Sequence, residues 1–179
     1  MGPNMQYPFN TRSFFTPANS KRIQGGLELW QGYFQSLRPS QNKLYVNIDI
    51  ATGIMYRSGS LLDLCLEFIN QRDPKVISPK ARFPDRERLR LQRFISNMRI
   101  LTNYGTPKGY VVRRLSDKGA SEILFTPKGG QQISVANYFK NHLNKTLKFP
   151  DTICVEVRFL RDSSTPGRRL TLNRSALAR

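Results

Sequence analysis

Aromatic and basic side chains alternate between residues 104 and 142, where the residue types favour a binding role. The aromatic members of this stretch are Tyr104, Tyr110, Phe125, Tyr138 and Phe139. The basic members are Lys108, Arg113, Arg114, Lys128, Lys140 and His142. Aromatic rings stack on nucleobases, which contributes about 1–3 kcal/mol per base, and tyrosine hydroxyls donate hydrogen bonds to phosphate oxygens. The mixture therefore indicates a site for single-stranded nucleic acid.

Two of these side chains share a helical spacing. Tyr138 and His142 are four residues apart, so on a helix both side chains rise from one face. A phosphate held between them and a tyrosine on a strand is geometrically reasonable. The alternative is that the aromatic residues of this helix are core contacts: we expect Phe139 to be core, and composition alone leaves Tyr138 open.

The charge of the chain points to the same class of partner. Its 179 residues carry 29 Lys and Arg against 12 Asp and Glu, which gives a net charge of +17 and a pI near 10.6. Self-repulsion on this scale is tolerated mainly by proteins that have an anionic partner. Nucleic acid is the first candidate, and an anionic membrane surface is the second. No apolar run approaches the ~18 residues of a spanning helix, and residues 1–10 lack the apolar core of a secretory signal.

Catalytic and metal-binding residues are sparse. The chain has one His and two Cys, which is too few for a four-ligand zinc site of the Cys/His kind. It shows no GxGxxG, P-loop or HExxH motif. Cys65 and Cys154 each lie inside an apolar pattern, so we expect buried, reduced thiols, with a disulfide as the alternative. We expect no enzyme activity, no metal and no cofactor.

The pattern of the chain predicts mostly strands with a few helices. Period-two alternation and turn residues predict strands at 44–50, 99–104, 110–115, 121–126 and 153–159. Apolar spacing predicts helices at 61–70 and 86–98 and after Ser134, capped by Ser60, Asp85 and Ser134. Turns are expected at 38–40 and 116–119, and a linker at 73–84. The order after residue 95 fits a small, partly open barrel with an inserted hairpin and helix.

Several longer motifs resemble one family. The quoted segments are GGLELWQGYFQSLRPSQNKLYVNIDI (25–50), NYGTPKGYVVRRLS (103–116), SEILFTP (121–127), ISVANYFKNHLNKTLKFP (133–150) and ICVEV (153–157). The first is similar to the linker segment that follows the N-domain of eukaryotic Argonautes, and of fungal members in particular. The others are similar to the Argonaute PAZ domain, in the same order and spacing.

The resemblance implies an α+β, mostly β fold class. It consists of an OB-like PAZ β-barrel with an inserted β-hairpin–helix module, preceded by an Argonaute linker segment with a strand and a helix. We accordingly expect an irregular lead-in at 1–24, the linker segment at 25–73, the PAZ domain at 74–160 and a basic, disordered tail at 161–179.

The resemblance also implies roles for individual residues. Tyr110 and Tyr138 match the pair of tyrosines that hydrogen-bond the terminal phosphodiester, and Phe125 matches the ring that packs on the terminal nucleotide. Lys108 and His142 match basic positions beside the RNA backbone. Asn103, Arg113 and Lys140 are further candidates for backbone contacts. Asn103 and Leu143 depart from the family, which usually has His at the first position and Tyr or His at the second.

The expected function is a non-catalytic module that holds the 3′ end of small single-stranded or overhang-bearing RNA in RNA silencing. Its expected partners are small RNA and proteins of the silencing machinery, with no membrane. After residue 157 the sequence departs from the family, so we expect no MID or PIWI domain and no slicing. We expect a cytoplasmic protein, with the nucleus as alternative location. The alternative function is that of a truncated or vestigial Argonaute fragment that acts through protein partners with a weakened RNA site.

Overall fold

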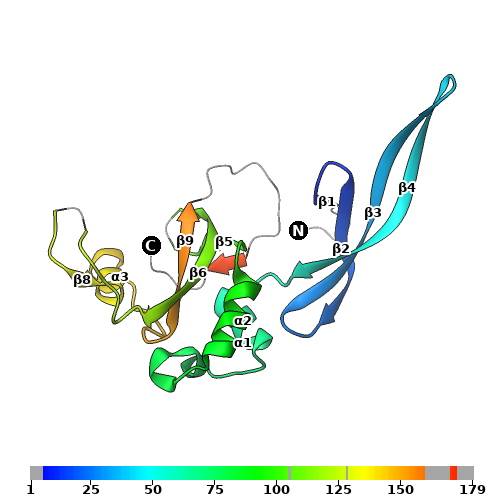
Figure 1. Ribbon diagram of the computed structural model, residues 1–179. Coiled ribbons are helices and arrows are strands. Elements are labelled where there is room, and N and C mark those ends of the chain that lie inside the picture. The colour runs from blue at the N-terminus through cyan, green and yellow to red at the C-terminus, as the bar shows by residue number, and fades with distance from the viewer. Residues whose placement is uncertain (1–5, 105, 128, 160–169, 173–179) are drawn as a thin grey trace. The chain divides into compact units, whose positions relative to one another are not determined.

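The chain forms two compact units (Figure 1). The computed structural model describes residues 6–104, 106–127, 129–159 and 170–172. The first unit contains the residues up to Arg57, and the second unit begins at Ser58. In the described part of the chain, no helix is long and apolar enough to cross a membrane.

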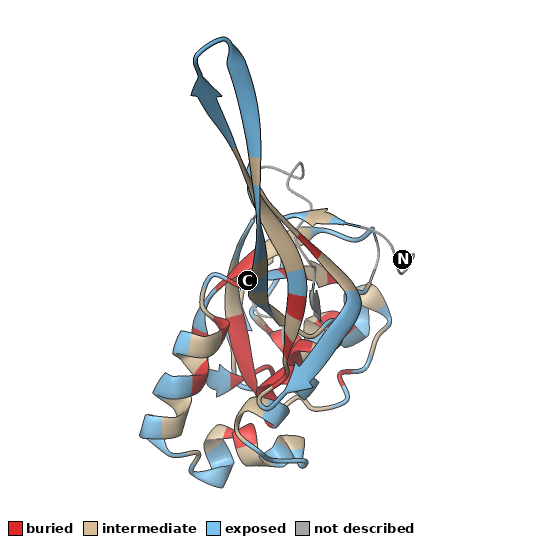
Figure 2. Cartoon of the chain, turned by 90° about the vertical axis from the view of Figure 1, so that its right-hand side faces the viewer, coloured by how far each residue is buried: buried red, intermediate tan, exposed pale blue. Residues whose placement is uncertain are grey.

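The first unit is an antiparallel sheet in the order β1-β2-β3-β4. Its strands are β1 (Tyr7–Pro8), β2 (Ser13–Ile23), β3 (Leu27–Ser40) and β4 (Lys43–Tyr56). Gly25 and Gly26, at φ 77° and 74°, turn the chain between β2 and β3, and Asn42 at φ 56° does so between β3 and β4. These residues tolerate the left-handed conformation that tight hairpin turns require. Away from this sheet's core the β3–β4 hairpin is exposed (Figure 2).

Two of the predictions for this unit are wrong. Residues 13–23 form β2 rather than an irregular lead-in. The strand tolerates Pro17 because the β2–β3 register is irregular between Thr16 and Lys21, so no backbone hydrogen bond between the two strands requires an N–H at Pro17. Residues 38–40, where a turn was expected, are the end of β3 and pair with β4. Pro39 is tolerated there because β2 pairs with β3 only as far as Phe34, which leaves the other edge of β3 open beside Pro39. The strand predicted at 44–50 is confirmed as part of the longer β4.

The core of the first unit depends on glycine. The Phe15 ring, which is 8% exposed, lies against Gly32 of β3 and Gly53 of β4. A Cβ on Gly32 would lie 2.0 Å from the backbone O of Phe14 and 2.6 Å from Cδ1 of Phe15. The sheet therefore has no space for a side chain at Gly32.

We expect Gly32→Ala to destabilise the first unit by about 1–3 kcal/mol, because the added methyl group overpacks the sheet. Trp30 is the only tryptophan and is buried in this unit, so its fluorescence reports unfolding in denaturant. Gln31→Ala, at an exposed position of the same strand, is the matched control. Equal unfolding midpoints for Gly32→Ala and the parent would contradict this account.

The second unit is built on a sheet in the order β10-β5-β6-β9. Its strands are β5 (Arg99–Thr102), β6 (Gly109–Gly119), β9 (Ile153–Phe159) and β10 (Leu170–Leu172). Before the sheet come α1 (Leu61–Phe68), the 3₁₀ helices η1 (Pro74–Ile77) and η2 (Pro79–Ala81), and α2 (Asp85–Ile95). Between β6 and β9 the chain inserts β7 (Leu124–Phe125), β8 (Ile133–Ser134) and α3 (Val135–Leu143). This order confirms the predicted fold class.

The helices begin largely where their caps predict. Ser60 Oγ accepts a hydrogen bond from the Asp63 N–H at 3.4 Å, and Ser134 Oγ accepts one from the Asn137 N–H at 3.2 Å. Asp85 is the first residue of α2 rather than its N-cap. Pro84 stands at the N-cap position and makes no side-chain hydrogen bond there. Helix α1, which the sequence analysis assigned to the linker segment, contacts α2 and β10 within the second unit.

The other differences in the second unit concern turns and strand ends. The turn expected at 116–119 belongs to β6, because Ser116 is held on both sides: its Oγ donates to the Lys118 O at 2.6 Å and accepts from the Cys154 N–H at 2.8 Å. The predicted linker at 73–84 contains η1 and η2. In the predicted disordered tail, Leu170–Leu172 instead pair in parallel with β5. The remainder of 160–179 lies outside the described residues.

Candidate nucleic-acid interface

Tyr110 and Tyr138 each lie near enough to Tyr104 to act on it electrostatically. Tyr104 follows β5, Tyr110 lies on β6 and Tyr138 lies on α3. The pKa of Tyr104 is raised to about 12, first because burial disfavours the phenolate and then because Tyr110 and Tyr138 lie close enough to act on it. Tyr104 therefore keeps its hydroxyl proton at neutral pH. We call Tyr104, Tyr110 and Tyr138 the tyrosine cluster.

The α3 side of the tyrosine cluster is a row of rings. The centre of the Tyr138 ring lies 5.2 Å from that of the Phe125 ring on β7, and the two ring planes are tilted by 68°. The centres of the Tyr138 and His142 rings are 4.7 Å apart, and their planes are stacked at 30°. The four-residue helical spacing places Tyr138 above His142, and the β7–β8 pairing brings Phe125 to the same face. Phe125 and Tyr138 are half-buried and His142 is exposed. This row offers a stacking surface that solvent can reach.

The part of the tyrosine cluster beside the β10-β5-β6-β9 sheet is held by packing. The rings of Tyr104 and Phe139 form a T-shaped contact with their centres 5.3 Å apart. Lys145 Nζ lies 5.9 Å from the centre of the Tyr104 ring. Tyr110 pairs with Ile100 of β5 and Phe159 of β9, and its ring contacts that of Phe159 edge-on at 5.7 Å. Both tyrosines are half-buried. Their rings are thus fixed while part of each side chain stays accessible.

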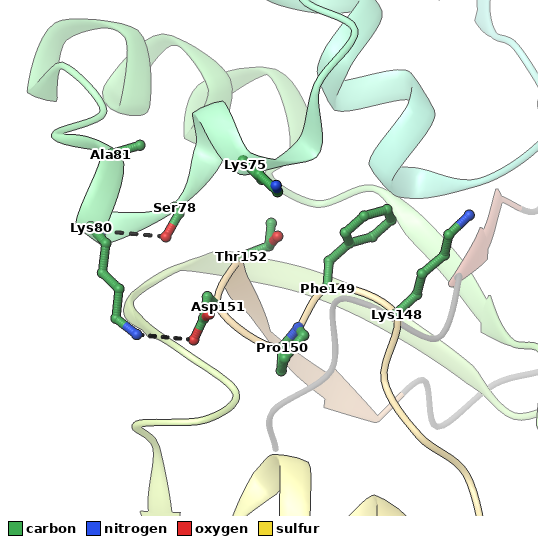
Figure 3. A pocket seen from close by; sticks show the side chains of 9 residues that line it. All are labelled: Lys75, Ser78, Lys80, Ala81, Lys148, Phe149, Pro150, Asp151 and Thr152. Carbon is green, nitrogen blue, oxygen red and sulfur yellow. Dashed lines mark hydrogen bonds and ion pairs between the residues drawn. The ribbon is translucent and has the colours of Figure 1, made fainter.

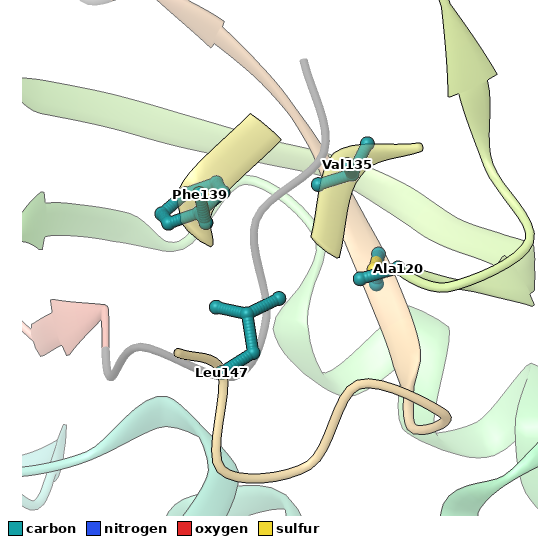
Figure 4. Packing of buried hydrophobic residues seen from close by; sticks show 5 residues of the cluster. Ala120, Val135, Phe139 and Leu147 are labelled. Carbon is teal, nitrogen blue, oxygen red and sulfur yellow. The ribbon is translucent and has the colours of Figure 1, made fainter. Parts of the chain in front are cut away.

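Phe139 belongs to a buried hydrophobic group of the second unit (Figure 4). It is 5% exposed and packs in a buried group with Ala120, Val135, Leu147 and Cys154. Tyr104, Phe125 and Tyr138 pack against this group from outside. The expectation that Phe139 is a core residue is confirmed. Tyr138, which composition left open, packs against the core and also belongs to the cluster.

The remaining predicted site residues lie apart from the tyrosine cluster or at its edge. Lys108 is exposed just before β6, where its backbone exchanges hydrogen bonds with Thr102 at 2.9 and 3.0 Å, and Asn103 is exposed beside Tyr104. Lys140 is exposed two positions beyond Tyr138, so it lies on another face of α3. Arg113 lines a different cavity of about 560 Å³ together with Leu124. Roles of these residues in RNA binding stay predictions.

Two residues at the cluster were missed by the site prediction. Tyr104 belongs to the aromatic stretch and to the quoted segment at 103–116, but the resemblance assigned it no role. Lys145 lies just after α3, where Asn144 at φ 49° ends the helix and the Lys145 N–H donates to the Phe139 O at 3.0 Å. A left-handed Asn after a helix is a readable signal for such a turn, but it does not say which ring the next side chain will face.

The two thiols are chemically quiet. Cys65 and Cys154 are free and buried, and burial raises the pKa of each thiol to about 12. The expectation of buried, reduced cysteines is confirmed over the alternative of a disulfide. In the described ranges, His, Cys, Asp and Glu form no group that could hold a metal ion.

Comparison with known proteins matches both units. Residues 11–57 match the Argonaute linker 1 domain, and residues 62–167 match the PAZ domain. The chain therefore belongs to the PAZ domain family. It carries that domain directly after linker 1, as Argonautes do, which confirms the resemblance found in the sequence.

Individual relatives agree with this assignment. The Argonaute of Schizosaccharomyces pombe (strain 972 / ATCC 24843) is 33% identical over 153 residues, which cover 82% of this chain and 18% of that protein. Argonaute 12 of Oryza sativa subsp. japonica is 30% identical over 155 residues, which cover 84% of this chain and 14% of that protein. The chain thus spans less than a fifth of the length of these relatives.

A solved structure supports the fold. The crystal structure of Kluyveromyces polysporus Argonaute with a guide RNA superposes with a TM-score of 0.56 at 17% identity. The match covers 93% of this chain and 22% of that chain. At this identity the likeness concerns the fold alone.

Proposed function

We propose that this chain binds the 3′ end of a single-stranded or overhanging RNA at the tyrosine cluster, without catalysing a reaction. The observation that carries the proposal is that Tyr104 packs against the same buried group as the Phe125–Tyr138–His142 row, with Tyr110 and Tyr138 near enough to act on Tyr104. Hydroxyls donate to phosphate oxygens, and the ring of Phe125 offers a platform for a terminal base. The K. polysporus relative was crystallised with a guide RNA, which supports RNA as the ligand.

The charge of the chain supplies the second part of the proposed binding. A net charge of +17 attracts any nucleic acid through phosphate contacts and counterion release, whatever its ends. Hydrogen bonds to a charged acceptor contribute about 1.5–3 kcal/mol each and depend on geometry. We therefore assign general affinity to Lys and Arg and preference for the 3′ end to the tyrosine cluster. Because the chain carries the Argonaute linker 1 and PAZ domains, we assign it the role of an Argonaute module in RNA silencing.

A second candidate is a vestigial module that acts through protein partners. Asn103 and Leu143 favour it, because the resemblance expects His at the first position and Tyr or His at the second. Leu143 packs against the buried group around Phe139, so it offers no polar contact. The two candidates differ in whether the 3′ end is recognised.

The test compares labelled RNA duplexes that carry a two-nucleotide 3′ overhang with blunt duplexes of equal length. We expect the overhang to bind about ten-fold more tightly, because at least one additional charged hydrogen bond forms. Affinity for both should fall roughly linearly on a log–log plot against salt. Equal, weak binding of the two duplexes would favour the vestigial module, and a flat salt response would refute the electrostatic part.

A further inference from the structure

The second unit has a cavity of about 390 Å³ built from residues outside the tyrosine cluster (Figure 3). One wall comes from η1 and η2, and the other from the segment between α3 and β9. The lining residues are Lys75, Ser78, Lys80, Ala81, Lys148, Phe149, Pro150, Asp151 and Thr152. Its volume lies within the range of about 300–1,000 Å³ that is usual for small-molecule sites.

The single carboxylate of this cavity is already engaged. Asp151 accepts a hydrogen bond from Ser121 Oγ at 2.6 Å and pairs with Lys80 Nζ at 3.2 Å. These contacts, the Ser121 bond first, lower the pKa of Asp151, so it stays ionised and satisfied near neutral pH. Lys80 also lies 3.8 Å from Glu122. Asp151 and Lys80 therefore largely balance one another.

Two further lysines give the cavity an excess of positive charge. Within the described ranges, neither Lys75 nor Lys148 forms an ion pair. Lys148 Nζ lies 5.4 Å from the centre of the Phe149 ring. An ammonium group beside an aromatic ring that borders a cavity is suited to a ligand with both a flat ring and an anion.

The walls of the cavity suit the flat part of such a ligand. Phe149, Pro150 and Ala81 give it apolar surface, and the Phe149 ring is half-buried. Ser78 and Thr152, 7% and 4% exposed, line it with hydroxyl-bearing side chains from the two sides (Figure 3). Hydroxyls can donate to or accept from the edge of a base.

We propose that this cavity is a second nucleotide site, which takes a base of the bound RNA strand at a position before its 3′ end. The base packs on Phe149, and Lys75 and Lys148 contact the adjacent phosphates. This inference rests on the proposed function, since it requires an RNA strand on the chain. The ligand chemistry is that of a phosphorylated nucleoside, and the experiment separates an RNA strand from a free nucleotide.

The test measures binding of single-stranded RNAs that share one 3′ end and increase in length. We expect Lys75→Ala/Lys148→Ala to leave the shortest RNA unaffected and to weaken the longest about ten-fold. For the longest RNA, the slope of log affinity against log salt concentration should decrease in magnitude by about 1.4 in this double variant, as expected for two lost single-strand phosphate contacts. The matched control is Lys21→Ala/Lys43→Ala, which removes the same charge from exposed positions of the first unit. Equal losses for the two double variants would overturn the proposal.

Crosslinking gives a readout that does not depend on charge. RNA with 4-thiouridine at successive positions should crosslink to the peptide that contains Phe149 when the label is internal, and to the peptide that contains Tyr138 when the label is terminal. No internal label on the Phe149 peptide would overturn the second site, while an intact preference for overhangs would leave the proposed function standing. Loss of overhang preference would instead refute the proposed function.

The source of the nucleotide is tested by protection of Lys75 and Lys148 from acetylation. We expect protection by the long RNA and little protection by adenosine monophosphate at the same nucleotide concentration. Equal protection by the free nucleotide would overturn the assignment to an RNA strand. Protection by an acidic peptide but not by RNA would overturn the nucleotide site itself.

Discussion

Replacing either Tyr110 or Tyr138 by Phe is expected to weaken binding of overhang RNA by about ten-fold or more, with blunt-duplex binding nearly unchanged. The change removes one hydroxyl and keeps the ring, so the contacts with Phe159 and with Phe125 and His142 can persist. A hydrogen bond to a charged acceptor contributes about 1.5–3 kcal/mol, and 1.4 kcal/mol corresponds to ten-fold in affinity. Blunt-duplex binding depends on diffuse Lys and Arg contacts that the change leaves in place.

The measurement is titration of labelled overhang and blunt duplexes with each folded variant. Tyr104→Phe belongs to the same series, since Tyr104 lies with the other two tyrosines and its high pKa keeps its hydroxyl a donor over the whole useful pH range. Tyr45→Phe, at an exposed position of β4, is the control and should bind like the parent. If Tyr110→Phe and Tyr138→Phe both bind overhangs as the parent does, the tyrosine cluster is not the site.

Local signals in the sequence were sufficient for the helical half of the site. Ser134 caps α3 through the Asn137 N–H, and the helical period places Tyr138 and His142 on one face, as the structure has them. Phe139, one position on, faces the core. The Ser134–Asn137 and Tyr138–His142 contacts lie within one helical segment, so the period of the sequence determines them.

The strand half of the site depends on partners far apart in the chain. Tyr104 and Tyr138 pack against the same buried group because the inserted module returns α3 toward the end of β5, and this return is not encoded near Tyr104. The same holds for β2, whose Pro17 predicts irregular chain until the register of β2 against β3 is known. Lys75 and Lys148 likewise meet at one cavity only after η1 and the segment before β9 are folded together.

Phe139→Ala should destabilise the second unit by about 3–5 kcal/mol, because it removes a large ring from a buried group that has little freedom to collapse. Phe139 is 5% exposed and packs with Ala120, Val135, Leu147 and Cys154. Its ring also contacts the Tyr104 ring in a T-shaped arrangement, with the ring centres 5.3 Å apart. We expect a lower free energy of opening for the amides of β6 and β9, measured by hydrogen exchange in mild denaturant. Trp30 fluorescence should not report this loss, since Trp30 belongs to the first unit.

The matched control for this prediction is Leu124→Ala on β7, which removes an aliphatic side chain that is 55% exposed and should change stability by no more than about 0.5 kcal/mol. Because Phe139 supports Tyr104, the remaining folded Phe139→Ala protein should also lose preference for 3′ overhangs while keeping its salt-dependent binding of blunt duplexes. Unchanged amide protection in β6 and β9 would show that the ring is not a core residue. Unchanged overhang preference alongside reduced protection would show that the Tyr104 position contributes nothing to RNA recognition.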